Sequence, residues 1–265
     1  MNRRLGQMVV AVILFGLAVI LCYYSIEVEQ AGPSDVEIIL VLDVSGSMGD
    51  LGTTGKPKVD EARDAAFEFL SVIDPDYEVG LVSFADAAQV ESGLTKSKDT
   101  IRNKVSQLPA GGQTAMGDGI GLGIEELSRS NKPGAQYIVL MTDGLSNQSN
   151  KYTPEQSSNL ARNKGIIVHS VAFGSDADAA LLKKISDKTG GKYFFAATGA
   201  DLVSVFGKIA EVINRRPIYY YGSRALLFVS VILIIFLPEI VRRTRMTLYR
   251  DKDRRVETKS YGGVD

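Results

Sequence analysis

Short, almost uninterrupted apolar runs between residues 36 and 214 are the strongest constraint on how this chain can fold. Residues 37–42 read EIILVL and residues 137–141 read YIVLM, and such runs are typical of strands buried on both faces of a sheet. Stretches with apolar side chains at helical spacing separate the runs, as in residues 59–73. The alternation predicts a doubly wound α/β fold, with a mainly parallel six-stranded sheet and helices on both faces.

The expected elements place candidate binding loops at one edge of this sheet. In a doubly wound sheet, ligands bind beyond the carboxyl ends of the strands, where the strand order reverses. The first strand begins near Val36 and the last helix ends near Asn214, so we expect both ends of the domain at the opposite edge. The pattern predicts strands at 37–42, 79–84, 88–91, 137–141, 166–172 and 192–195, and helices at 59–73, 114–129, 154–163, 177–188 and 201–214.

Two apolar stretches flank the predicted domain. Residues 8–24 contain no charged side chain, and residues 218–241 contain a long apolar run that begins after Arg224. Stretches of this length can span a bilayer as helices. Residues 21–30, at the end of the first stretch and directly after it, read LCYYSIEVEQ and offer no small-x-small cleavage site, which favours an uncleaved anchor over a signal peptide. We therefore expect transmembrane helices at 8–24 and 218–241, with tethers at 25–35 and 215–217.

The basic residues near these stretches predict their orientation. Arg3 and Arg4 precede the first stretch, and no Lys or Arg follows it until Lys56. Basic residues near a span favour the cytoplasmic side. We therefore expect a multi-pass cell-membrane protein with residues 1–7 and the tail at 242–265 in the cytoplasm and the middle domain (36–214) outside. The basic residues of the tail are Arg242, Arg243, Arg245, Arg250, Lys252, Arg254, Arg255 and Lys259.

Composition disfavours several classes of function. The chain has 30 Lys and Arg against 31 Asp and Glu, whereas a nucleic-acid-binding protein needs a basic face for the phosphates, so we expect no nucleic-acid partner. Cys22 is the single cysteine, which excludes an internal disulfide and a thiolate zinc cluster. His169 is the single histidine and lies within a predicted strand, where a packed side chain is expected rather than a metal ligand.

Three loops after strands or before helices carry oxygen-bearing side chains. The first is the sequence DVSGS, which places Asp43, Ser45 and Ser47 directly after a predicted strand. The second contains Thr114 in GGQTAMGD, and the third contains Asp143 in MTDG. Carboxylates and hydroxyls are ligands for hard cations, which suggests Mg2+, with Mn2+ or Ca2+ as alternatives. Each loop taken alone is also consistent with ordinary turn and helix-capping residues.

The order and spacing of these motifs resemble the metal-ion-dependent adhesion site of von Willebrand factor type A (VWA) domains. The resemblance covers residues 36–214, and the flanking apolar stretches make the chain similar to the membrane-anchored BatA/BatB-like members. It implies that Ser45, Ser47 and Thr114 contact the metal through hydroxyls, and that Asp43 and Asp143 bind it directly or through water. It also implies a protein partner whose Asp or Glu carboxylate completes the coordination. Asp118 is expected either to orient the metal shell or to be a solvated helix residue.

Three functions are compatible with these residues. The favoured one is a membrane-anchored, divalent-cation-dependent protein-binding module for the assembly or maintenance of a cell-envelope complex. The alternative, from similar proteins, is an accessory subunit of a MoxR-type AAA+ ATPase chaperone system. A metallohydrolase would need a general base near the ion, and the sequence offers no convincing candidate beyond the ligands themselves. We therefore expect binding rather than catalysis.

Overall fold

Six strands form one sheet in the computed structural model, which describes residues 35–130, 132 and 134–214. The strand order is β3-β2-β1-β4-β5-β6, and only β3 runs antiparallel to its neighbour. The predicted six-stranded, mainly parallel sheet is confirmed. The strands are β1 (Glu37–Asp43), β2 (Glu78–Phe84), β3 (Ala88–Thr95), β4 (Gln136–Thr142), β5 (Ile167–Phe173) and β6 (Tyr193–Ala196).

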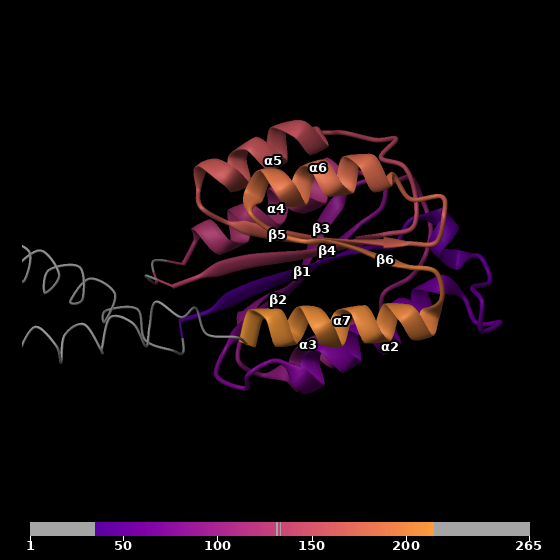
Figure 1. The fold of residues 1–265 in the computed structure, drawn as a ribbon, viewed down its shortest axis with the longest axis horizontal. Coiled ribbons are helices and arrows are strands. Elements are labelled where there is room, and N and C mark those ends of the chain that lie inside the picture. The colour runs from indigo at the N-terminus through magenta and orange to yellow at the C-terminus, as the bar shows by residue number, and fades with distance from the viewer. Residues whose placement is uncertain (1–34, 131, 133, 215–265) are drawn as a thin grey trace, which may run out of the picture. The chain divides into compact units, whose positions relative to one another are not determined.

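Helices cover both faces of the sheet (Figure 1). Alternate side chains of β1 point to opposite faces, as the pleat of a strand requires. Ile38 and Leu40 belong to a buried cluster with α2, α3 and α7, whereas Ile39 belongs to a second cluster with α4, α5 and α6. The helices are α2 (Lys58–Val72), α3 (Lys98–Val105), α4 (Met116–Ser128), α5 (Pro154–Asn163), α6 (Ala179–Thr189) and α7 (Gly199–Asn214), with a short 3-10 helix η1 (Gly46–Gly49).

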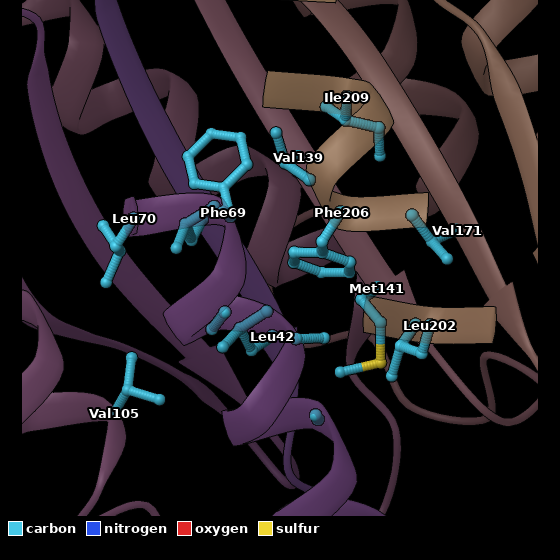
Figure 2. Packing of buried hydrophobic residues seen from close by; sticks show 14 of the residues in the cluster. Leu42, Phe69, Leu70, Val105, Val139, Met141, Val171, Leu202, Phe206 and Ile209 are labelled. Atoms are coloured by element: carbon cyan, nitrogen blue, oxygen red, sulfur yellow. The ribbon is translucent and has the colours of Figure 1, made fainter. Parts of the chain in front are cut away.

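Aromatic packing joins the two longest helices of the first cluster to the sheet. Phe69 of α2 and Phe206 of α7 meet edge to face, with ring centroids 6.3 Å apart and an interplanar angle of 84°. This geometry is favourable for aromatic pairs. Figure 2 shows the two rings among Leu42, Val139 and other side chains of the sheet. The packing fixes α7 beside α2 along the same face.

The structure differs from the sequence-based expectation at several elements. Helix α3 and the short 3-10 helix η1 are absent from the prediction. Helix α3 buries only Ile101 and Val105 among charged residues, so its periodicity is weak. Helix η1 has only four residues. Strand β3 continues to Thr95 instead of ending at 91, and its half-exposed edge position hides the apolar signal. Helices α4 and α6 begin two residues later than predicted, and α7 begins two residues earlier.

The sheet places the two ends of the domain opposite the candidate loops. The side chain of Asn214, the last residue of α7, accepts a hydrogen bond from the amide of Asp74 (3.0 Å) and donates one to the carbonyl of Val72 (2.8 Å). These residues precede β2, so α7 ends at the amino edge of the sheet, where β1 also begins (Figure 1). The expected placement of residues 36 and 214 is confirmed.

No helix within the described part of the chain is long and apolar enough to cross a membrane. The predicted spans at 8–24 and 218–241, the N-terminal segment at 1–7 and the basic tail at 242–265 lie outside the described residues, as do the predicted tethers except Asp35.

Candidate metal centre

Asp43 ends the central strand β1 and is held in place by its neighbours. The amide of Ser45 donates a hydrogen bond to Asp43 Oδ1 (2.8 Å). The hydroxyl of Thr142, the last residue of the adjacent strand β4, donates to Asp43 Oδ2. Strands β2 and β3 lie on one side of β1, and β4 to β6 lie on the other. Asp43 is therefore at the point where the strand order reverses, the expected position for a ligand site.

Hydrogen bonds connect Asp43 to the other loops. Ser47 Oγ donates to Asp143 Oδ1 (2.6 Å), and Ser45 Oγ lies 3.3 Å from Ser47 Oγ. Asp43, Ser45 and Asp143 are all buried. Four of the five predicted site residues are thus linked in one hydrogen-bonded group, although the first three are about a hundred residues away from Asp143 in the sequence.

Thr114 belongs to a third loop that is fastened to the other two through backbone contacts. The amide of Gly46 donates to the carbonyl of Gly112 (2.9 Å), and this close approach would be crowded by a side chain at Gly46. Gly112 has a φ of +85°, which other residues rarely adopt. The amide of Thr114 donates to Asn147 Oδ1 in the loop that follows Asp143 (2.9 Å). The structure therefore places Thr114, which is buried, between the two other loops.

Asp118 organises the loop after Asp143 and is not a solvated helix residue. It is buried, and its carboxylate accepts hydrogen bonds from the amides of Asn150 (2.6 Å), Lys151 (2.8 Å) and Tyr152 (2.6 Å). Burial raises the pKa of Asp118, but these backbone hydrogen bonds outweigh it and hold the pKa below its usual value. Asp118 thereby fixes the course of the chain between β4 and α5.

Lys58 is a residue of this centre that sequence reasoning missed. Its Nζ lies 2.7 Å from Asp143 Oδ2, on the carboxylate oxygen that Ser47 does not contact. A lysine at the start of a helix is usually solvated, so the sequence contains no signal that would have singled it out. The contact joins residues 85 positions apart.

The two carboxylates of the centre are costly to bury together. Burial is the largest effect on Asp43 and raises its pKa to about 6, against the hydrogen bonds from Ser45 and Thr142, and the negative charge of Asp143 adds to the rise. Within the described residues, no group of three or more His, Cys, Asp or Glu side chains could hold a metal. Any metal here would depend on hydroxyl oxygens beside Asp43 and Asp143. This donor set consists of hard oxygen ligands and fits a divalent cation such as Mg2+.

A family model for the von Willebrand factor type A domain matches residues 37–208. The chain belongs to this family. The matched region begins at the first residue of β1 and ends within α7, so the described VWA domain contains all three candidate loops.

Bacterial proteins are among the relatives of this VWA chain. A UPF0353 protein of Mycolicibacterium gilvum is 27% identical over 232 residues, which cover 75% of this chain and 69% of the relative. The match is longer than the VWA domain itself.

Solved structures share the fold of this VWA domain. BatB from Bacteroides thetaiotaomicron has a TM-score of 0.56 at 18% identity, covering 66% of this chain and 98% of that one. An aerotolerance-related membrane protein from Bacteroides fragilis has a TM-score of 0.57 at 18% identity, covering 68% and 100%. A von Willebrand factor type A protein from Catenulispora acidiphila reaches 0.58 at 22% identity, and this chain covers only 41% of it. At these identities the likeness extends to the fold alone.

Proposed function

We propose that this VWA domain is a divalent-cation-dependent protein-binding module. Asp43, Ser45, Ser47, Thr114 and Asp143 would hold the ion, with Mg2+ as the expected occupant. The observation that carries the proposal is the hydrogen-bonded group of hydroxyls and carboxylates at the switch point of the sheet. When bound, the ion supplies a Lewis-acidic position for a carboxylate oxygen of the partner.

The chain's own residues prepare this position in three ways. Thr142 and the Ser45 amide orient Asp43, and Ser47 orients Asp143, so the oxygens are set before a ligand arrives. Burial keeps bulk water away from both carboxylates, which strengthens their electrostatic interactions. The hydroxyl ligands are neutral, so the centre adds no negative charge beyond its two carboxylates to repel an incoming carboxylate of the partner.

Exposed apolar side chains beside the centre favour a protein as the partner. Leu51 and Leu145 have 72% and 59% of their surface exposed. Leu51 follows the loop of Ser47, and Leu145 comes two residues after Asp143. Apolar residues around a charged contact exclude water and contribute to protein–protein affinity. A protein segment that presents an Asp or Glu among apolar residues would fit this surface.

The proposed setting is the cell membrane. The apolar stretches at 8–24 and 218–241 would anchor the chain, and the basic residues at both ends would place the VWA domain outside. The fold similarity to an aerotolerance-related membrane protein is consistent with this setting. In this setting the partner would be a component of the cell envelope.

Calorimetric titration of the purified chain with Mg2+ tests the metal site. Asp143→Asn removes a buried negative charge from the centre, so we expect at least a tenfold loss of affinity, or about 1.4 kcal/mol. Asp187→Asn is a matched control, because Asp187 is an exposed carboxylate on α6. Equal Mg2+ affinity of the wild type and Asp143→Asn would contradict the proposal.

Selection from a displayed peptide library tests the partner chemistry. In Mg2+ the wild type should enrich peptides that contain Asp or Glu beside apolar residues. A chelator, or the Asp143→Asn substitution, should abolish the enrichment. Peptides that bind equally well in the chelator would show a binding surface that does not depend on the metal.

A further inference from the structure

We infer that Lys58 is a built-in counter-charge of the metal centre, which balances Asp143 without a metal and weakens the hold on a divalent cation. This inference rests on the proposed function, because it concerns the same site. Lys58, which is not one of the five motif residues, would position the Asp143 carboxylate and set the net charge of the centre. Three features of the structure support this role: the burial of the pair, the different partners of the two Asp143 oxygens, and the place of Lys58 on its helix.

The Lys58–Asp143 pair is the most deeply buried ion pair within the described residues. The side chain of Asp143 is fully buried, and that of Lys58 is 19% exposed. Every other carboxylate paired within this part of the chain is at least 12% exposed. A fully buried carboxylate without a counter-charge is strongly unfavourable. Lys58 therefore supplies the positive charge that Asp143 needs when no metal is bound.

The two oxygens of Asp143 serve different partners. Oδ1 accepts the hydrogen bond from Ser47, whose hydroxyl lies beside that of Ser45, whereas Oδ2 accepts from Lys58. The ammonium group of Lys58 thus contacts the Asp143 oxygen that Ser47 does not contact. Lys58 can keep this contact while Oδ1 binds a cation. Its positive charge then repels the cation and reduces the negative charge that the centre offers.

The position of Lys58 on α2 is unfavourable except for this contact. Lys58 is the first residue of α2, where the helix dipole disfavours a positive charge. Its amide donates to the carbonyl of Asp50 (2.9 Å), and the amide of Asp50 donates to the carbonyl of Ser47 (3.1 Å). The backbone of Lys58 is therefore fastened to the same loop that carries Ser45 and Ser47, and its side chain is directed to Asp143 from there.

Titration of the full chain with Mn2+, with free Mn2+ measured by electron paramagnetic resonance, tests the inference. Lys58→Met removes the charge and keeps a similar length. We expect its Kd for Mn2+ to fall at least tenfold, and its melting temperature in a chelator to fall by several degrees. Lys58→Arg keeps the charge and should resemble the wild type in both measurements. A residue with only a structural role would weaken Mn2+ binding when replaced.

The remaining possible results for Lys58→Met either support or overturn the inference. If Lys58→Met is folded and binds Mn2+ no more tightly than the wild type, the inference is overturned. If it is unfolded in chelator but folds with Mn2+, the metal has replaced the missing charge and the inference is supported. If it is unfolded in both conditions, Lys58 is needed for structure and the inference fails. Absence of Mn2+ binding in the wild type as well would count against the proposed function itself.

Discussion

His169 shows how a polar residue within a strand is accommodated by its neighbours. It is buried on β5, its ring stacks on Tyr137 with centroids 5.9 Å apart, and its Nδ1 accepts a hydrogen bond from the amide of Lys192 (3.0 Å). Burial, and to a lesser extent the charge of Lys192, lowers its pKa from 6.5 to about 4. The sequence-based interpretation of a packed strand histidine is confirmed.

The lowered pKa predicts a loss of stability in acid. Between about pH 6.5 and about pH 4 the unfolded chain binds a proton at His169 and the folded chain does not. The free energy of unfolding therefore decreases as the pH is lowered through this range. His169→Asn keeps an acceptor for the Lys192 amide but does not titrate. The variant should therefore lose less stability than the wild type on acidification, by at most about 3 kcal/mol. Urea midpoints at several pH values measure the difference.

The wild type must be compared with His169→Asn, because Asp43 also changes the stability in acid. Its pKa is raised to about 6, so the folded chain binds a proton more readily than the unfolded chain, and acid stabilises the fold through this group. The two effects oppose each other in the wild type. Subtracting the variant's curve from that of the wild type cancels the contribution of Asp43. Parallel curves for both proteins would contradict the assignment of acid sensitivity to His169.

Helix α4 illustrates what an element requires beyond its periodicity. Glycines occupy positions 117, 119, 121 and 123 of this helix. Close contacts with Tyr152, Thr153 and Phe84 leave little room for larger side chains at the first three of these positions. A Cβ at Gly117 would overlap with the backbone at Tyr152 and Thr153, and one at Gly119 would lie 2.7 Å from the ring of Phe84. The glycines therefore allow α4 to pack against both the sheet and the loop that follows Asp143.

Alanine substitutions separate this packing from helix propensity. Gly117→Ala should destabilise the protein by about 1–3 kcal/mol, because the added methyl group meets backbone that cannot move aside easily. Gly207→Ala in α7 is the matched control, since its Cβ would lie 3.7 Å from the nearest atom, in Glu68. It should stabilise by about 0.5–1 kcal/mol through helix propensity. Chemical unfolding measures both, and equal effects would contradict the packing argument.

The elements were predictable to different degrees for a physical reason. The central strand β1 is buried along its whole length and its residues 38–42 are all apolar, so its position could be predicted. Helix α3 is mostly solvated, and two buried residues do not create a detectable period. The edge strand β3 alternates weakly for the same reason. An element can be predicted from sequence where burial restricts every position to apolar residues. It is missed where solvent-exposed positions tolerate many residue types.

At the scale of the whole domain, one sheet couples both hydrophobic layers. Ile38, Leu40 and Leu42 pack with α2, α3 and α7, whereas Ile39 and Val41 pack with α4, α5 and α6. Disrupting β1 would expose both layers together. The two layers should therefore unfold as one cooperative unit rather than separately.

Urea unfolding of residues 35–214 tests this coupling. Circular dichroism reports the helices of both layers, and tyrosine fluorescence can be followed without interference, because the chain has no tryptophan. We expect the two probes to give the same midpoint and a single transition. Two midpoints that differ clearly would show that the layers unfold independently.

All six strands, most of the helices and the loops that carry Asp43, Thr114 and Asp143 were predictable from the sequence, because apolar periodicity is local and parallel strands place their carboxyl ends at one edge. The folded domain was needed to show that Lys58 pairs with Asp143, that Asp118 holds the loop before α5, and that Asn214 fastens the end of α7. These contacts join distant parts of the chain. A polar side chain has the same local sequence signal whether it meets water or a partner, so its role depends on the packing that surrounds it.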